Sequence, residues 1–116
     1  MKIYNEHKDK RKEKCLQIDC IAWFKHNYDH CIFHVANEAQ GNKAYYSERY
    51  KMGVLSGVSD IIILTERIAF IELKTTSKPS KNQLKFLEEM DNLGHFASIC
   101  YSLPDFKAAV KDFLDA

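Results

Sequence analysis

Residues 60–74, DIIILTERIAFIELK, decide the fold of this chain. The run Asp60–Leu64 is rich in β-branched residues and is bounded by Gly57 and a polar turn, which predicts a buried strand. Ile68–Lys74 is a second apolar run that follows the short turn 65–67. The two runs are therefore expected to pair as an antiparallel hairpin, with the start of the first beside the end of the second.

Upstream of this hairpin the sequence predicts one helix and one strand. Apolar residues recur at helical spacing from about Asp9 to Lys25, and Cys31–Val35 is a short apolar run typical of a strand. Residues Asn37–Gly57 are polar, aromatic and punctuated by glycine, which predicts a long loop or an irregular excursion. Loops of that length in compact domains are usually functional or carry some structure of their own.

Downstream of the hairpin the pattern alternates between helix and strand. Residues 80–93 predict an amphipathic helix that has Ser80 as its N-cap and ends at Gly94. His95–Tyr101 predicts a strand, and a last helix is expected after Pro104. In the order α-β-β-β-α-β-α, the helix between the third and fourth strands is a crossover that makes them parallel. The predicted fold class is α/β, with a mixed sheet flanked by helices.

Length and composition indicate one soluble globular domain over residues 1–116, with 46% hydrophobic and 28% charged residues. No apolar run approaches the roughly 20 residues of a membrane helix, and the N-terminus lacks a signal-peptide pattern, so a cytoplasmic location is expected. The four cysteines are scattered and predict buried, reduced thiols. His30 and His34 flank Cys31 without zinc-site spacing, so we interpret them as structural or exposed.

Charge is unevenly distributed along the chain, although the net charge is only +1. Residues 1–14 carry a local charge of +3 and residues 73–87 one of +4, whereas residues 88–116 carry −4. The two basic segments can line one face that meets phosphate, with the acidic tail turned away. Solvated surface charge is the alternative interpretation, which the charge pattern alone leaves open.

The hairpin brings two carboxylates to one end of the sheet. Asp60 begins the first strand and Glu72 lies near the end of the second, and strand alternation places Lys74 on the same face as Glu72. Two converging carboxylates form a hard oxygen site suited to Mg²⁺, for which Mn²⁺ can substitute, and the backbone carbonyl of Leu73 is a further potential ligand. Lys74 is placed to orient or deprotonate a water, or to lie against phosphate. A strand-end cap with a surface ion pair is the alternative, but Glu72 interrupts an otherwise apolar strand.

Six sequence elements, in this order, resemble the PD-(D/E)xK nuclease superfamily and, within it, the VRR-NUC family of virus-type replication-repair nucleases. They are Glu13 with Gln17, Asn37-Glu38, Lys51-Met52-Gly53, Gly57-Val58-Ser59-Asp60, Glu72-Leu73-Lys74, and Ser80 with Gln83. The resemblance covers nearly the whole chain and implies a restriction-endonuclease-like α-β-β-β-α-β core with a C-terminal helix, as a stand-alone nuclease domain. Ser59 stands where the family usually has proline.

The resemblance also implies roles for individual residues. Asp60 and Glu72 would hold the metal, Lys74 would serve the attacking water, and Gln83 would contact the site from its helix. Glu13 would approach the metal directly or through water. For Glu13 and Gln83, an exposed charge and an exposed helix residue remain the alternatives. From the charge distribution and the resemblance together, contacts to DNA are assigned to four lysines: Lys51, Lys78, Lys81 and Lys85.

The expected function is Mg²⁺-dependent hydrolysis of phosphodiester bonds in branched DNA, such as four-way (Holliday) junctions or flaps, during replication, recombination or repair. The resemblance implies a homodimer, no membrane partner, and a source that includes phages. An archaeal-type Holliday junction resolvase shares the same core and is the enzymatic alternative. A non-catalytic nucleic-acid-binding module and a small assembly protein are alternatives of other classes. The segment Tyr45–Tyr50 is open to three roles: base stacking, a dimer surface or local packing.

Overall fold

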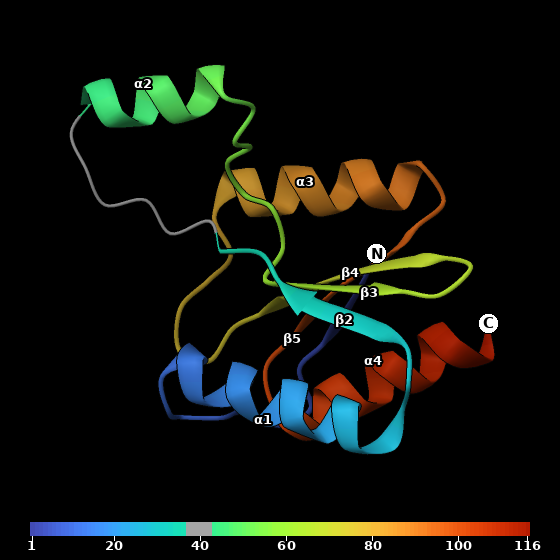
Figure 1. Cartoon of the computed structure of the whole chain (residues 1–116). Coiled ribbons are helices and arrows are strands. Elements are labelled where there is room, and N and C mark those ends of the chain that lie inside the picture. The colour runs from blue at the N-terminus through green and yellow to red at the C-terminus, as the bar shows by residue number, and fades with distance from the viewer. Residues whose placement is uncertain (37–42) are drawn as a thin grey trace.

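The structure, a computed structural model, describes residues 1–36 and 43–116. Within these ranges a mixed sheet has the strand order β1-β5-β4-β3-β2, and helices cover both of its faces (Figure 1). The strands are β1 (Lys2–Tyr4), β2 (Cys31–His34), β3 (Ile61–Leu64), β4 (Ile68–Leu73) and β5 (Phe96–Cys100). The helices are α1 (Glu13–Asn27), α2 (Lys43–Lys51), α3 (Lys81–Asn92) and α4 (Leu103–Asp115). The α3 helix covers one face, α1 and α4 cover the other, and α2 stands away from the sheet on the α3 side (Figure 1).

The predicted hairpin and the predicted crossover are both confirmed. Strands β3 and β4 pair antiparallel, with Ile61 opposite Ile71. Strands β4 and β5, which α3 joins, pair parallel, with Glu72 opposite Ile99. Continuing the β3–β4 register by one residue places Asp60 opposite Glu72, so the register itself brings the two carboxylates together. The structure therefore has the predicted α/β class with a mixed sheet.

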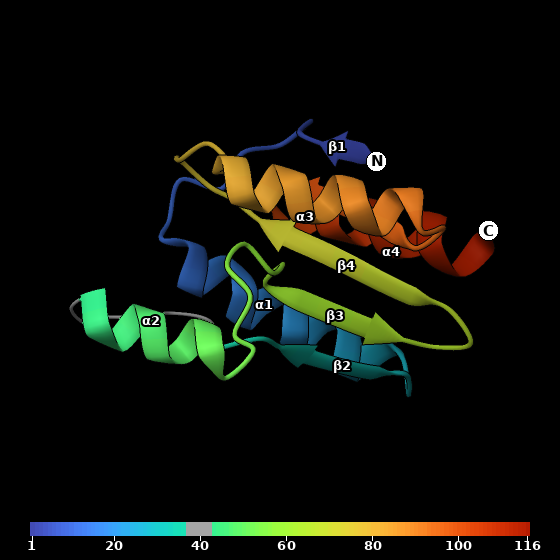
Figure 2. The same ribbon diagram turned by 90° about the horizontal axis from the view of Figure 1, so that it is seen from above.

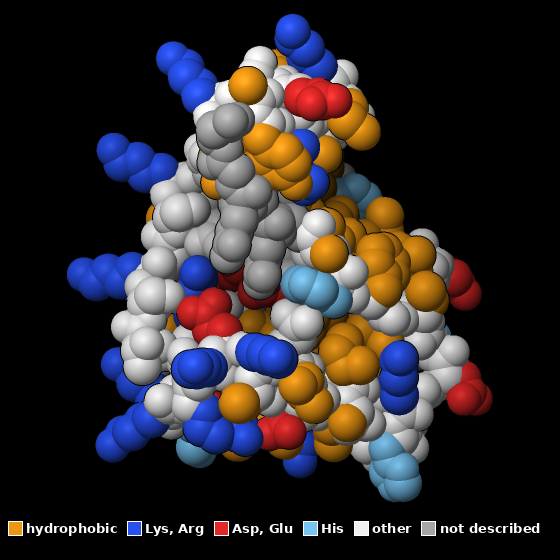
Figure 3. Space-filling view, turned by 60° about the vertical axis from the view of Figure 1, so that its left-hand side comes forward, with side chains coloured by type: hydrophobic (Ala, Val, Ile, Leu, Met, Phe, Trp, Pro, Cys, Tyr) orange, Lys and Arg blue, Asp and Glu red, His pale blue; other side chains and the backbone are white. Residues whose placement is uncertain are grey.

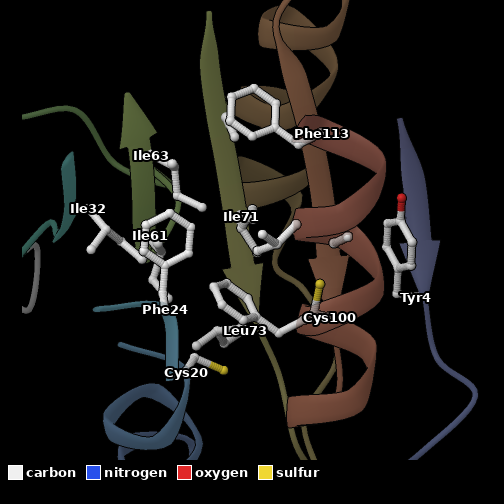
Figure 4. Close-up of a cluster of buried hydrophobic side chains, with 14 of the residues drawn as sticks. Tyr4, Cys20, Phe24, Ile32, Ile61, Ile63, Ile71, Leu73, Cys100 and Phe113 are labelled. Atoms are coloured by element: carbon white, nitrogen blue, oxygen red, sulfur yellow. The ribbon is translucent and has the colours of Figure 1, made fainter. Parts of the chain in front are cut away.

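Alternation along β4 divides the core into two layers. Ala69, Ile71 and Leu73 are fully buried in the cluster that the sheet forms with α1 and α4 (Figure 4). Phe70 faces the other way and packs against the smaller cluster beneath α3, which includes Phe86 and Leu87. Because side chains alternate, Glu72 and Lys74 lie on the α3 face with Phe70. The same apolar packing that fixes the strand therefore fixes the direction of these two charged side chains.

The N-terminal region differs from its prediction in two ways. The first helix begins at Glu13 rather than Asp9, because the Asp9 carboxylate accepts a hydrogen bond from the Arg11 N–H at 2.8 Å and its own N–H donates to the Tyr101 carbonyl at 3.0 Å. The short edge strand β1 was not predicted, and it pairs parallel with β5. Only Tyr4 of its three residues is buried, so β1 carries no clear apolar pattern.

The long loop predicted over 37–57 contains a helix, so that prediction was wrong for α2. None of the residues of α2 is buried, which explains why no apolar periodicity marks it in the sequence. Gly53 ends the helix at φ +92°, donating its N–H to the Tyr50 carbonyl while the Val54 N–H donates to the Arg49 carbonyl, each at 3.0 Å. This is a Schellman cap, and it explains the glycine of the Lys51-Met52-Gly53 element structurally. Asn37 and Glu38 lie outside the described residues.

The cysteine and membrane expectations can also be compared with the structure. Cys20 and Cys100 are buried as predicted, but Cys15 is only partly buried and Cys31 is exposed, and all four are free thiols. Cys31 is exposed because it lies on the edge strand β2, beyond the cover of the core. Over the described ranges, no helix has the length and apolar character needed to cross a membrane.

Gly57 fixes the loop that leads from α2 into β3, and its replacement by alanine is expected to be costly. Its φ is +86°, and an added Cβ would lie 2.5 Å from the backbone carbonyl of Asn82 in α3. Gly94 has a similar φ of +90° but open space around it. We expect Gly94→Ala to lower the free energy of unfolding by about 1 kcal/mol and Gly57→Ala by about 3 kcal/mol, because a steric clash adds to the backbone strain. Urea denaturation measures both, and equal losses would contradict the assigned close approach.

Candidate active site

Four segments that are distant in sequence meet at one end of the sheet. Figure 2 shows that β4 ends and β3 begins at this end, where the first turns of α1 and α3 also lie, with α2 nearby. Antiparallel pairing brings the strand ends together, and the crossover to β5 starts α3 at the same place. The residues predicted for the site from the sequence lie on these segments, at this end of the sheet.

The carboxylates of Asp60 and Glu72 each accept a hydrogen bond from a backbone N–H at or next to the other residue. The Asp60 N–H donates to Glu72 Oε1 at 3.1 Å, and the Leu73 N–H donates to Asp60 Oδ2 at 2.9 Å. Each carboxylate is thus oriented by the strand that carries the other one. The predicted convergence of the two carboxylates is present, and it leaves one oxygen of Glu72 outside this reciprocal pair.

Glu72 is the most unusual ionisable residue of the site. It is fully buried, and among the described residues its Oε2 atom has no hydrogen-bond partner. Burial is the main reason that the pKa of Glu72 is raised to about 9, and the neighbouring Asp60 carboxyl adds to the effect while Lys74 opposes it. A carboxyl group in this position is costly to ionise without a cation, because its buried surroundings and the nearby Asp60 carboxylate both disfavour the negative charge.

Lys74 lies between two carboxylates. Its side chain is 9% exposed, and its Nζ lies 4.0 Å from Glu72 Oε2 and 3.9 Å from Glu13 Oε1. Glu13 comes from the first turn of α1, and its other oxygen accepts a hydrogen bond from the Ser77 hydroxyl at 3.0 Å. The predicted common face of Glu72 and Lys74 is present, and Glu13 joins the same group through Lys74.

The residues present fit a hard divalent cation. The unpartnered Oε2 of buried Glu72 and the adjacent Asp60 carboxylate offer oxygen donors, which Mg²⁺ and Mn²⁺ prefer. A small cavity of about 130 Å³ is lined by Asp60 and also by Glu13, His34 and Leu73. No group of three acidic, histidine or cysteine side chains in the described ranges is already arranged around one point. Two carboxylates with water and substrate oxygens are the donor set expected for Mg²⁺.

A larger cleft of about 650 Å³ is also lined by Asp60. Figure 3 shows acidic side chains near the middle of this face, with lysine and arginine side chains along its margin. Ser80 and Gln83 line the cleft at the start of α3, where the Ser80 N–H donates to Gln83 Oε1 at 2.8 Å and the Gln83 N–H donates to Ser80 Oγ at 3.1 Å. Gln83 is therefore partly used as a capping box, which leaves its amide nitrogen as the group that can face a ligand.

His34 belongs to this site, although its sequence spacing indicated only a structural or exposed residue. Its Nδ1 lies 2.8 Å from the Asp60 carbonyl oxygen, which also accepts the Val35 N–H at 3.0 Å. Because a carbonyl only accepts, Nδ1 carries the proton. His34 lines both cavities and fixes the backbone of Asp60. Spacing alone does not identify it, because the strand pairing, and not the sequence interval, brings it to Asp60.

The four lysines assigned to DNA do not line the cleft. Lys51 lies at the end of α2, Lys78 lies in the loop before α3, and all four side chains are exposed. Lys81 and Lys85 lie one turn apart on α3, whose first turn has no acidic residue and whose last turn has no basic residue. This arrangement opposes the helix macrodipole, which favours acidic residues first and basic residues last.

The fold is shared with a protein of known structure, although sequence comparisons find no match. No family model matches the sequence, and no curated protein does. Among solved structures, a protein described as a VRR_NUC domain protein matches with a TM-score of 0.75 and 19% sequence identity. The match covers 92% of this chain and 91% of that chain. The two proteins share one fold, so the restriction-endonuclease-like architecture predicted from the sequence is confirmed.

Proposed function

We propose that this chain is a metal-dependent deoxyribonuclease of the VRR-NUC family, which hydrolyses phosphodiester bonds in branched DNA. The observation that carries the proposal is the buried side chain of Glu72 beside Asp60 and Lys74, because its Oε2 atom has no hydrogen-bond partner among the described residues. A structural ion pair has no reason to leave one oxygen of a buried carboxylate unsatisfied, whereas a cation site requires a donor in that state.

Asp60 and Glu72 are the residues that would hold Mg²⁺ or Mn²⁺, with the Leu73 carbonyl as a further ligand and Glu13 acting directly or through water. The cation, when bound, supplies an activated water and stabilises negative charge on phosphate. Lys74 places its ammonium group beside both Glu72 and Glu13, where it orients the attacking water and lies against the phosphate. Gln83 contributes its side-chain amide N–H groups from the start of α3, since its Oε1 atom already accepts the Ser80 N–H.

The lysines near the start of α3 supply the contact to the DNA backbone. Lys81, the first residue of α3, places positive charge at the positive end of the helix dipole, at a cost of about 0.3–1 kcal/mol, with Lys78 just before the helix and Lys85 one turn further along. A polyanion at the cleft reverses the sign of that cost, because phosphate favours both the lysines and the helix N-terminus. The local conflict with helix stability is thus explained by binding.

Branched DNA is the proposed substrate, with a homodimer as the acting form. The support is the family resemblance of the sequence elements together with the fold shared with the VRR_NUC domain protein. Two active sites related by two-fold symmetry would match the symmetry of a four-way junction. Replication, recombination and repair produce such structures in any cell or phage-infected host.

Substrate choice is tested by presenting end-labelled four-way junction, flap, single-stranded and duplex DNA to the protein with Mg²⁺ or Mn²⁺. We expect the branched substrates to be cut fastest, and light scattering to report a dimer under the same conditions. Equal cutting of linear duplex would remove the branched-DNA assignment. Binding of all four DNAs without any cutting would favour the non-catalytic binding module.

A further inference from the structure

One face of α2 forms a wall of the cleft that contains Asp60. Tyr46, Arg49 and Tyr50 all line this cleft, across from residues of β2, α3 and the loop that follows α2. Their spacing of i, i+3 and i+4 places them on the same side of the helix. No residue of α2 is buried, so this face does not belong to the apolar core formed by the described residues.

The chain has three arginines, and Arg49 differs from the other two in its hydrogen-bond acceptors. Within the described ranges, the hydroxyl of a tyrosine is its only acceptor. Arg11 pairs with Asp9 and Asp19 at 2.7 Å each, and Arg67 donates to the Phe113 carbonyl. Arg49 donates from Nη1 to the Tyr45 hydroxyl at 3.1 Å and forms no ion pair there.

The buried edge of Arg49 is the informative part of this side chain. Its Nε atom is buried and, among the described residues, has no hydrogen-bond partner. The guanidinium carbon lies over the Tyr45 ring, 5.4 Å from its centroid, and Nη1 already donates to the hydroxyl of the same residue. The edge formed by Nε and Nη2 is the pair of donors that binds a phosphate in a bidentate manner. A buried donor without an acceptor is costly, and none is present for this edge in residues 1–36 and 43–116, so a bound phosphate would relieve that cost.

Tyr50 offers a stacking surface one residue further along the helix. Its side chain is 78% exposed, although it also lines the cleft. An exposed aromatic ring beside a phosphate-binding arginine is the combination by which proteins hold unpaired nucleotides, with one group for the backbone and one for the base. A fully paired duplex keeps its bases stacked internally and has no free base face to offer.

We infer that the Tyr46–Arg49–Tyr50 face of α2 is a clamp for an unpaired nucleotide next to the scissile phosphate. Arg49 binds a backbone phosphate through its Nε and Nη2 edge, and Tyr50 stacks on the base. This inference rests on the proposed nuclease function and adds a reason for substrate choice. The clamp selects strands that have unpaired bases at the cleavage site, as flaps and junction arms do.

The clamp is tested by fluorescence anisotropy with labelled single-stranded, flap and blunt duplex DNA in EDTA, where metal-dependent cutting cannot occur. We expect Arg49→Gln to weaken binding of single-stranded and flap DNA by about 10-fold or more and to reduce the salt slope by about 0.7. Arg49→Lys should keep the salt slope but lose most of that affinity, because lysine lacks the bidentate fork. Tyr50→Ala should weaken single-stranded and flap binding by about 10-fold, leaving blunt duplex binding unchanged, whereas Tyr50→Phe should bind like wild type.

Lys111→Gln is the matched control, because it removes one exposed positive charge from α4 on the opposite face of the sheet. Circular dichroism melting should be unchanged in every variant, because Tyr50 and Lys111 are exposed and Arg49 is only partly buried. The clamp is overturned if Arg49→Gln and Lys111→Gln lose equally little affinity, or if Tyr50→Ala weakens duplex and single-stranded binding alike. Failure of the nuclease function gives a different result, in which wild type cuts none of these DNAs with Mg²⁺, whatever the binding of the variants.

Discussion

Replacing Glu72 by Gln is expected to abolish cleavage and, at the same time, to make the metal-free protein more stable at neutral and alkaline pH. Cleavage should fall by about 10³-fold or more, because a metal ligand and its negative charge are both lost. The gain in stability has a separate origin. Gln is nearly the same size as Glu and keeps an oxygen to accept the Asp60 N–H, but it carries no buried charge.

The pH dependence of this effect follows from the raised pKa of Glu72. In the unfolded chain the carboxyl has its ordinary pKa of 4.5, whereas in the folded chain the pKa is about 9. Between these values the folded state holds a proton that the unfolded state has released, so the free energy of unfolding of the metal-free protein falls as pH rises. The stabilisation is fully present below pH 4.5 and is lost as pH approaches 9. Glu72→Gln should flatten this part of the profile.

Urea denaturation in EDTA at a series of pH values between 5 and 9 measures the profile, with Glu89→Gln on the exposed part of α3 as the matched control. Added Mg²⁺ should stabilise wild type most at high pH and should leave Glu72→Gln unchanged, because a ligand stabilises only the state that binds it. A wild-type profile without this loss of stability, or a Glu72→Gln enzyme that still cuts, would contradict the assigned site.

Replacing Lys74 by Met is expected to remove cleavage while leaving metal binding nearly intact. Methionine keeps much of the apolar stem of lysine but removes the ammonium group that lies within 4.0 Å of both Glu72 and Glu13. The rate should fall by about 10²-fold or more, the scale of a lost acid-base or electrostatic group. Because Lys74 lowers the pKa of Glu72, metal binding by the variant should begin at a higher pH than in wild type.

Electron paramagnetic resonance of Mn²⁺ separates the two effects for Lys74→Met, with Lys25→Met at the exposed end of α1 as the control for loss of a lysine. Cleavage lost together with Mn²⁺ binding at every pH would assign Lys74 a structural role. Cleavage retained at the wild-type rate would remove Lys74 from the reaction.

The hairpin and its charged residues could be predicted from the sequence, because local rules determine them. The β-branched run before Leu64 and the short turn after it specify two paired strands, and alternation then fixes which face carries Glu72 and Lys74. The α3 helix could also be predicted, because Ser80 and Gln83 form a capping box at its start and an amphipathic pattern follows. Each of these elements is specified by a few neighbouring residues in the sequence.

The remaining parts of the site depend on long-range pairing or on ligands, and sequence patterns do not record either. His34 reaches Asp60 only because β2 pairs with β3, and its sequence interval gave no metal-binding signal. The α2 helix lacks an apolar face directed at the core, so Arg49 was read as part of a loop. The burial of Glu72 was suggested by its apolar neighbours, but the unpartnered oxygen appears only in three dimensions.

The central claim, that Asp60 and Glu72 form a metal-dependent nuclease site, is tested most directly by one cleavage experiment. An end-labelled flap or four-way junction is incubated with wild type in Mg²⁺, with wild type in EDTA, and with Asp60→Asn in Mg²⁺. Asparagine retains an oxygen for the Leu73 N–H, so the variant should stay folded. We predict that the DNA is cut by wild type in Mg²⁺ and is not cut under the other two conditions. Cutting that survives in EDTA or in Asp60→Asn, or no cutting under any condition, would contradict the claim.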